Sequence, residues 1–214
     1  MRGILRTLKT WCISLLIAFL IIFIIKTFIG VPTTVKGTSM FPTFYSGEKL
    51  IVSTWDSTFD KVPRRGDCIT FEAPSVDYIE NADMKNPVAI YNEKEKSFME
   101  KLAYKAFGIS KSSYIKRVVG LPGEHVEIKN DKVYIDGKQL NEDYLFSTVR
   151  TNDSMGGEFY DVVVPDGCVY VLGDNRMSSA DSRRFGCVPI KKIEGRAWIR
   201  WYPYKKLGTI KRGK

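Results

Sequence analysis

The sequence predicts a mostly β fold that follows one N-terminal membrane helix and contains a short helical insertion. Three observations support this fold class. Residues 11–25 contain no charged side chain, and the apolar stretch resumes after Lys26 up to residue 31, so about 20 residues are available to cross a bilayer. Beyond this stretch, most segments combine β-branched and aromatic residues in the short runs that are typical of strands. Only residues 75–113 carry few strand signals.

The residues around the apolar stretch predict its orientation. Arg2, Arg6 and Lys9 precede it and no acidic residue occurs among residues 1–10, so the positive-inside rule places the N-terminus in the cytoplasm. A cleaved secretory signal peptide has the same basic start and apolar core. However, the bulky residues at 26–29 do not resemble an Ala-x-Ala cleavage site, which favours a retained anchor with the rest of the chain outside the cell membrane.

The net charge of +9 is concentrated at the two ends of the chain. Besides the N-terminal cations and Lys26, the excess comes from five C-terminal residues, Lys205, Lys206, Lys211, Arg212 and Lys214. Residues 27–204 are therefore neutral overall, whereas a nucleic-acid-binding domain carries its basic residues on the folded surface. This excludes nucleic acid as an expected partner. The basic tail at 205–214 either touches anionic lipid or frays into solvent.

The strands are expected to follow one another as an antiparallel meander in at least one region. Expected strands cover residues 49–53, 67–71, 114–119, 125–128, 133–135, 160–164, 169–172 and 196–201. Turn-forming residues at 130–131 and 136–137 flank one of these strands on both sides. Within the insertion, Phe98, Leu102 and Ala106 recur once per helical turn and predict an amphipathic helix over 98–107. This helix either packs on the domain or dips into the membrane surface.

The histidine and cysteine content limits the chemistry. His125 is the only histidine, so a His-rich metal site is excluded and a Ser-His-Asp site would require this residue. Cys12 lies in the predicted anchor, and Cys68, Cys168 and Cys187 are far apart without metal-ligand spacing. We expect the last three to be small buried side chains, with one external disulfide as the alternative. No metal and no cofactor is expected.

Ser39 and Lys116 are the candidate reactive residues. Ser39 follows the anchor in the string Gly-Thr-Ser-Met-Phe-Pro-Thr, where Gly37 allows close backbone approach and Pro42 stiffens the chain. Backbone N–H groups at such a bend can face a developing oxyanion. Lys116 lies in an apolar strand, where burial without a carboxylate would lower its pKa and allow it to accept a serine proton. Strand alternation leaves open whether Lys116 or Arg117 faces inward.

A polar segment at 173–186 follows the strand at 169–172. Two acidic residues alternate in it with two arginines, and these are Asp174, Arg176, Asp181 and Arg183. The segment is either an ordinary polar loop or a fixed network of ion pairs. We favour the network, because a reactive serine–lysine pair requires such supporting contacts.

Taken together, these strings resemble those of bacterial type I signal peptidases. The strings at 37–43, 114–123 and 173–186 occur in the family's order and membrane context, and those at 49–52 and 65–67 are similar to its intervening strands. The resemblance covers most of the chain apart from roughly 75–113 and 140–165. It implies a curved antiparallel β-sheet catalytic domain with an apolar surface near the bilayer, as in single-span forms from Gram-positive bacteria.

The resemblance also implies roles for individual residues. Ser39 would be the nucleophile, Lys116 the general base, and Ser179 the residue that orients the lysine amine. The Ser39 backbone N–H would donate to the oxyanion, and Gly37 stands where some relatives carry a second, hydroxyl donor. The supporting residues would be Asp181, Arg183, Asp174 and Arg176. The shallow apolar pockets for the substrate would be lined by Val35, Met40, Phe44 and Ile115.

The function implied by the resemblance is that of a membrane-anchored serine endopeptidase. It would remove signal peptides from secretory preproteins after small residues, with the substrate bound as an added strand between residues 33–37 and the Lys116 strand. Alternatives are a related peptidase dedicated to a restricted substrate such as a pilin, a self-cleaving regulator with the same dyad, and a membrane-tethered assembly factor without activity. The expected partners are preproteins and the lipid bilayer.

We expect a basic cytoplasmic N-terminus at residues 1–10, a transmembrane anchor at 11–31, an extracytoplasmic catalytic domain at 32–204 and a basic tail at 205–214. Within the catalytic domain, the insertion covers about 75–113 and the small subdomain covers about 124–168.

Overall fold

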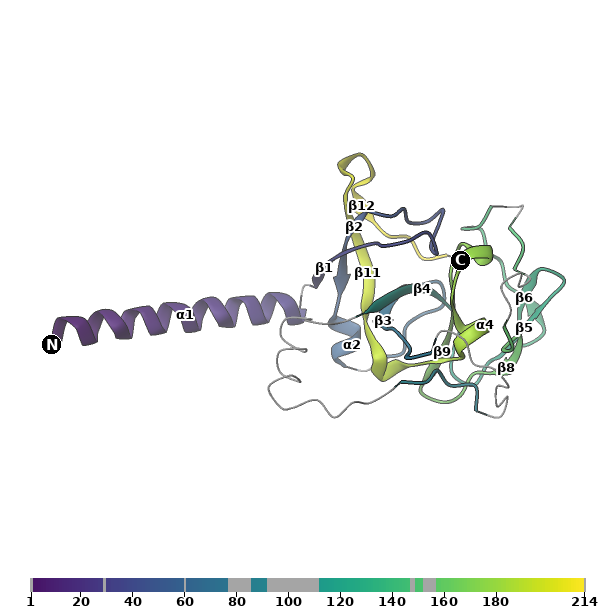
Figure 1. Ribbon diagram of the computed structural model, residues 1–214, viewed down its shortest axis with the longest axis horizontal. Helices are drawn as coiled ribbons and strands as arrows, with labels where there is room; N and C mark the ends of the chain where they lie inside the picture. Colours follow the sequence, from purple (N-terminus) through teal and green to yellow (C-terminus); the bar gives the residue numbers. More distant parts are fainter. Residues whose placement is uncertain are drawn as a thin grey trace.

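A long N-terminal helix projects from a body made mostly of strands (Figure 1). The computed structural model describes residues 2–28, 30–59, 61–76, 86–91, 112–146, 149–151 and 157–213. The helix expected at 98–107, and with it most of the insertion, lies outside these residues. Helix α1 (Arg2–Phe28) exposes large apolar side chains along much of its length, from Leu8 to Ile22. Among the residues whose side chains are described, no helix is long and apolar enough to cross a membrane.

The larger sheet has eight strands, and its pairs are antiparallel. The order is β1-β2-β11-β3-β4-β9-β10, and β12 pairs with β11 beside this path. The bounds are β1 (Val31–Thr34), β2 (Lys49–Ser53), β3 (Cys68–Glu72), β4 (Ser113–Gly120), β9 (Cys168–Leu172), β10 (Val188–Pro189), β11 (Ile193–Tyr202) and β12 (Gly208–Thr209). The register of β11 shifts against both β2 and β3, and that of β4 shifts against β9. Such bulges bend strands and increase their twist.

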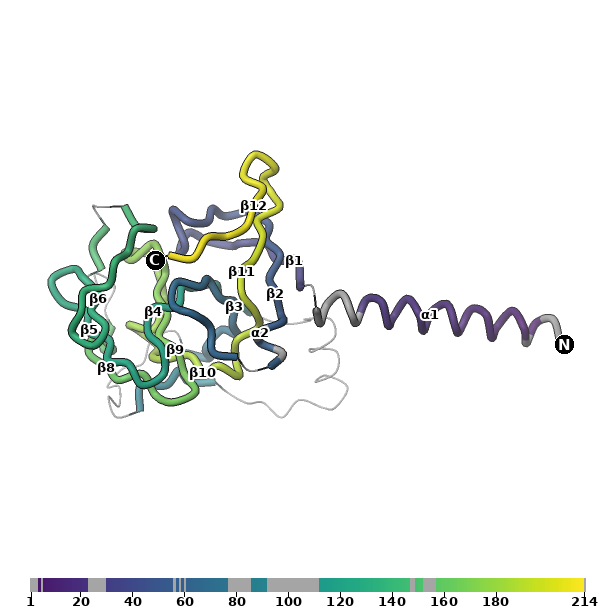
Figure 2. Tube along the Cα trace, turned by 180° about the vertical axis from the view of Figure 1, so that it is seen from behind, coloured from purple at the N-terminus to yellow at the C-terminus, as the bar shows by residue number. Residues whose placement is uncertain are grey.

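A second, four-stranded sheet has the order β7-β6-β5-β8. Its strands are β5 (His125–Lys129), β6 (Lys132–Ile135), β7 (Lys138–Gln139) and β8 (Asp161–Val163). Asn130, Asp131, Asp136 and Gly137 all have positive φ, which fits the two tight turns predicted from these residues. The meander is thus confirmed. Figure 2 shows this sheet at the opposite end of the body from α1, and β1 and α2 (Trp55–Thr58) at the near end.

The core consists of three apolar clusters, and β4 and β9 lie between two of them. Val119 of β4 packs in the cluster beneath the second sheet, whereas its neighbour Val118 packs in the cluster around Phe71 and Phe185. The same alternation holds along β9, all of whose residues are buried. A strand that is covered on both faces has a continuous run of apolar residues in its sequence instead of an alternating pattern. This is why alternation in the sequence could not assign the faces of β4.

The remaining helical turns are short. They are α4 (Ser182–Phe185) and the 3₁₀ turns η1 (Arg176–Ser178), η2 (Ile190–Lys192) and η3 (Tyr204–Lys206). The cysteines are all free, and Cys68, Cys168 and Cys187 are buried as expected, so the alternative of an external disulfide is wrong. Fraying of the basic tail is also wrong for residues 205–213, because β12 pairs with β11 and the Ile210 N–H donates to the Trp198 carbonyl at 2.8 Å.

Candidate active site

Ser39 and Lys116 lie in contact although they are far apart in the sequence. Ser39 belongs to the turn-rich segment 37–44 between β1 and β2, and Lys116 lies in the middle of β4. The Lys116 Nζ atom donates a hydrogen bond to the Ser39 Oγ atom at 2.9 Å and another to the Ile115 carbonyl at 3.1 Å. The structure therefore places the amine where it can exchange a proton with the hydroxyl.

The segment that carries Ser39 is held in place by its own apolar residues. Gly37 has a φ of 81°, a conformation that L side chains rarely adopt. The Phe44 N–H donates to the Met40 carbonyl at 2.8 Å, and both side chains are buried in the third core cluster. Because Met40 and Phe44 fix the segment from beneath, Ser39 remains partly accessible at the surface.

Lys116 and Arg117 are both buried, with exposed fractions of 4% and 1%. This answers the question that alternation left open, since neither of the two points to solvent. The Lys116 Nζ atom lies 5.1 Å from the centroid of the Tyr114 ring. Removing an amine from water disfavours its charged form. An enclosed lysine that contacts a serine hydroxyl is therefore suited to act as a general base.

Asn175 and Gly173 connect the segment 173–186 to the backbone of the nucleophile. The Asn175 N–H donates to the Ser39 carbonyl at 3.0 Å, and its side-chain amide donates to the Thr38 carbonyl at 3.1 Å. A Cβ added at Gly173 would lie 2.6 Å from the Ser39 carbonyl oxygen and 2.1 Å from the Ser179 Oγ atom. Only glycine fits there. Sequence reasoning assigned no role to either residue, because nothing local shows which distant segment they touch.

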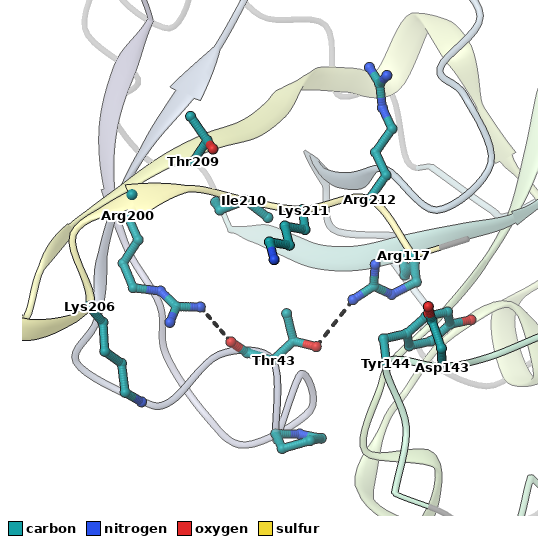
Figure 3. Close-up of a pocket in the computed structure, with 13 residues that line it drawn as sticks. Thr43, Arg117, Asp143, Tyr144, Arg200, Lys206, Thr209, Ile210, Lys211 and Arg212 are labelled. Atoms are coloured by element: carbon teal, nitrogen blue, oxygen red, sulfur yellow. Dashed lines mark hydrogen bonds between the residues drawn. The ribbon is translucent and has the colours of Figure 1, made fainter.

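Arg117 joins three parts of the site and is a third residue whose role was missed. Its Nε and Nη2 atoms donate to the two carboxylate oxygens of Asp174 at 2.8 and 2.7 Å. Nη2 also donates to Thr43 Oγ1 at 3.1 Å, and Nη1 donates to the Gly66 carbonyl at 2.9 Å. Figure 3 shows Thr43 between Arg117 on one side and Arg200, which donates to the Thr43 carbonyl, on the other.

Asp181 and Arg183 form a buried ion pair inside the polar segment. Arg183 donates to the two carboxylate oxygens at 2.8 and 2.9 Å, and the Gly173 N–H donates to one of them at 3.0 Å. Burial by itself raises the pKa of Asp181, but the Arg183 guanidinium and the Gly173 N–H outweigh it and hold this pKa below its ordinary value. The carboxylate also accepts the Arg183 N–H and so caps the short helix α4.

Arg176 is held by Glu142 and Thr151 outside the polar segment and by Gly173 within it. It forms an ion pair with Glu142, donates to Thr151 Oγ1 at 2.7 Å and donates to the Gly173 carbonyl at 3.0 Å. The four predicted supporting residues of the segment are thus fixed, as the network hypothesis expected. Among its described ion pairs, however, only the Asp181–Arg183 pair is internal, because Asp174 pairs with β4 and Arg176 with residue 142.

Ser179 lies beside the dyad without contacting the lysine as the resemblance implied. It is 3% exposed, its hydroxyl helps to lower the pKa of the nearby Asp181, and its Oγ atom makes no hydrogen bond of ordinary geometry with the described residues. The hydrogen bond to the Lys116 amine is therefore not formed in this structure. Ser179 packs closely against Gly173, where no side chain would fit between them.

The four residues predicted to line the substrate pockets gather in one apolar cluster. Val35, Met40 and Phe44 are 4%, 1% and 0% exposed, and Ile115 is partly buried against them. Three of the four are therefore closed into the core, and Ile115 alone presents accessible surface. A separate cavity of about 480 Å³ is bordered by Thr43, Arg117 and Tyr144, and neither Ser39 nor Lys116 lines it.

The described residues offer no site for a metal ion. No group of three or more His, Cys, Asp or Glu side chains among them could hold one. His125 lies on β5 of the second sheet, where its Nε2 atom pairs with the exposed Asp161 carboxylate.

Comparisons with known proteins agree on one family. The family model described as "Signal peptidase, peptidase S26" matches residues 8–202. Signal peptidase IB of Staphylococcus aureus is 30% identical, over 94% of this chain and 93% of its own length. Signal peptidase I of Bacillus amyloliquefaciens is 32% identical, over 96% of this chain and 91% of its own length. A crystal structure of a signal peptidase I from Enterococcus faecalis is 31% identical, with a TM-score of 0.39, over 63% of this chain and 95% of that one.

Proposed function

Since the chain belongs to the signal peptidase family S26, whose members are serine proteases that remove signal peptides, we propose that it cleaves preproteins with a Ser39–Lys116 dyad. The observation that carries this proposal is the hydrogen bond of 2.9 Å between the lysine amine and the serine hydroxyl.

The proposed reaction uses these two side chains in turn. Neutral Lys116 removes the hydroxyl proton while the Ser39 Oγ atom attacks the scissile carbonyl carbon. The oxyanion forms near the Ser39 backbone N–H, and the lysine then gives its proton to the leaving amine. Lys116 next removes a proton from water, which attacks the acyl-enzyme ester, and then returns that proton to the leaving Ser39 Oγ atom as the signal peptide departs with a new carboxylate. Asp174, Arg176, Asp181 and Arg183 keep the segment behind the dyad fixed.

The substrate is proposed to bind as an extended strand beside β1. Within the described part of the chain, β1 pairs only with β2, so the other edge of β1 has backbone groups available for a peptide. Ile115, which precedes the lysine in β4, is the one predicted pocket residue with accessible apolar surface, and it packs against the buried cluster that contains Val35. Because so little apolar surface is open there, we propose that small residues of the Ala-x-Ala type are favoured at the cleavage site and that larger side chains clash.

Helix α1 is proposed to anchor the enzyme with its N-terminus in the cytoplasm and its catalytic domain outside. The uncharged residues 11–25, the preceding cations and the exposed apolar side chains of α1 support this arrangement. Anchoring would hold the site near membrane-bound preproteins and raise their effective concentration. The lipid bilayer is thus the second proposed partner.

The test is cleavage of a secretory preprotein by the purified full chain in liposomes. Ser39→Ala and Lys116→Ala should each lower kcat by roughly 10³-fold or more, because the two groups act as one unit. Thermal unfolding should show that both variants fold, and Lys138→Ala, which removes an exposed lysine of β7, is the matched control. Full activity of either dyad variant would reject the mechanism.

Two further outcomes separate the alternatives. Sequencing of the products shows whether cleavage follows a small residue, and a panel of unrelated preproteins distinguishes a general enzyme from one dedicated to a single substrate. Binding of preproteins without any cleavage by the wild-type protein would favour the non-catalytic assembly factor.

A further inference from the structure

The segment 208–213 returns from the β11–β12 hairpin to the back of the site. It is tied first to β11, where Thr209 pairs with Ile199 and the Ile210 N–H donates to the Trp198 carbonyl. The Ile210 side chain then packs on the apolar cluster that holds the nucleophile segment. Figure 3 shows this segment, from Thr209 to Arg212, crossing in front of β4 towards Arg117.

Arg212 fixes the far part of this segment. Its Nε atom donates to the carboxylate of Asp67, which is only 4% exposed. Asp67 is itself bound to β4, because its carbonyl accepts the Val118 N–H at 2.9 Å. An ion pair with one partly exposed and one enclosed partner is screened less by solvent than a surface pair. Through Asp67, Arg212 therefore links the segment to β4, the strand that carries the dyad lysine.

Gly213 lies between Tyr144 and Gly66, where there is no room for a side chain. A Cβ at Gly213 would lie 2.3 Å from a Tyr144 ring carbon and 3.3 Å from the Arg117 Nη1 atom. From the opposite direction, the Gly213 carbonyl oxygen lies 2.2 Å from the place of a Cβ on Gly66. The two backbones approach this closely only because both residues are glycine.

Tyr144, Gly66 and Gly213 together enclose the guanidinium of Arg117. The Tyr144 ring centroid lies 3.9 Å from it, the Gly66 carbonyl accepts one of its protons, and the Gly213 backbone lies against Nη1. Arg117 borders the cavity described above, but it is only 1% exposed and Asp174 is fully buried, and low exposure to water strengthens their pair. Asp174 directly precedes Asn175, whose N–H holds the Ser39 carbonyl.

We propose that residues 210–213 are a positioning segment for the dyad, an inference that rests on the proposed function. The segment keeps Arg117 enclosed, and Arg117 in turn holds Thr43, four residues after Ser39, and Asp174, next to the Asn175 that binds the Ser39 carbonyl. Displacing the segment admits water to the Arg117–Asp174 pair and weakens the hold on the loops that carry Thr43 and Asp174. The Ser39 Oγ atom then moves relative to the Lys116 amine. Arg212 and Gly213 act through these contacts and touch no reacting atom.

The experiment compares two glycine substitutions in the same segment of the full chain. Gly213→Ala meets the Tyr144 ring, whereas a Cβ at Gly208 meets nothing within 4 Å. With a soluble signal-sequence peptide, Gly213→Ala should lower kcat by about tenfold or more and leave KM within about twofold, because a displaced catalytic group reduces transition-state stabilisation. Gly208→Ala should match the wild type in both constants.

A second pair of variants covers the case in which Gly213→Ala does not fold. Arg212→Gln should lower kcat in the same way, and Arg212→Lys should restore most of it by keeping the ion pair with Asp67. Wild-type kcat in Arg212→Gln, or an effect on KM alone, would overturn the positioning role. If Ser39→Ala is inactive while Arg212→Gln and every folded Gly213→Ala preparation are fully active, the positioning role fails and the proposed function stands. If Ser39→Ala is active, the proposed function itself fails.

Discussion

Replacing Gly173 by alanine tests whether the polar segment holds the nucleophile through direct backbone packing. The new Cβ would lie 2.5 Å from the Ser179 Cβ atom and 2.6 Å from the Ser39 carbonyl oxygen. It would also meet the Ser179 Oγ atom, but a hydroxyl can rotate away at little cost. The two other contacts involve atoms that move only with the backbone. Alanine at this position therefore has to push the Ser39 segment and the polar segment apart.

The displacement of the Ser39 segment that alanine requires is large enough to affect the catalytic rate. Ordinary contact begins near 3.4 Å, so the Ser39 carbonyl has to retreat by about 0.8 Å (3.4 − 2.6). Overpacking of this kind destabilises a protein by about 1–3 kcal/mol. A displacement of about 1 Å at a reacting group costs about 10²-fold in rate. We expect Gly173→Ala to remain folded and to lose kcat by a factor between about ten and a hundred.

The assay measures kcat and KM on a signal-sequence peptide together with the midpoint of thermal unfolding. Gly208→Ala is again the control, because it makes the same chemical change in open space. If Gly173→Ala kept the wild-type kcat and unfolding midpoint, the packing of residue 173 against the nucleophile segment would not matter for the site. A loss of stability with unchanged kcat would likewise refute the reasoning.

Two other predictions concern the buried groups. Asp181→Asn should destabilise the protein by about 3–5 kcal/mol at neutral pH, since it leaves Arg183 buried without its partner. Because the pKa of Asp181 is lowered on folding, its contribution is present above the ordinary pKa and is lost as the pH falls below about 4, so denaturant unfolding should show the two proteins converging there. A constant difference down to pH 2 would contradict this pairing. Burial raises the pKa of Cys68 to about 12 and also raises that of Cys187, so a thiol-alkylating reagent at pH 8 should modify both only in denaturant. Rapid alkylation of the native protein would show that these thiols are accessible.

The sequence was sufficient for much of the fold because strand patterns and turn residues act locally. The turns at 130–131 and 136–137 adopt the positive φ that their residue types favour, and the strands between them pair as predicted. The tail was predicted less well. Its composition favours solvent or lipid, but the partners that hold Ile210 and Arg212 lie in distant strands.

The candidate site shows the same division. The strings around residues 39, 116 and 173–186 identified its members, and the resemblance named a family that the comparisons support. The sequence did not show that Asp174 pairs with Arg117, or that Ser179 stays without a hydrogen bond to the lysine. Which acid meets which base depends on the sheet order that brings β4 beside β9, and not on distance along the chain.

The sequence by itself thus determined the residue types available for chemistry, the mostly β character and the family of this protein. Only the tertiary structure decided that Lys116 and Arg117 are both enclosed, that Lys116 contacts Ser39 while Arg117 binds Thr43 and Asp174, and that the Gly213 backbone lies against Arg117. The physical reason is that burial and ion pairing are set by strands that are distant in sequence, whereas propensity and motif act within a few residues of one another.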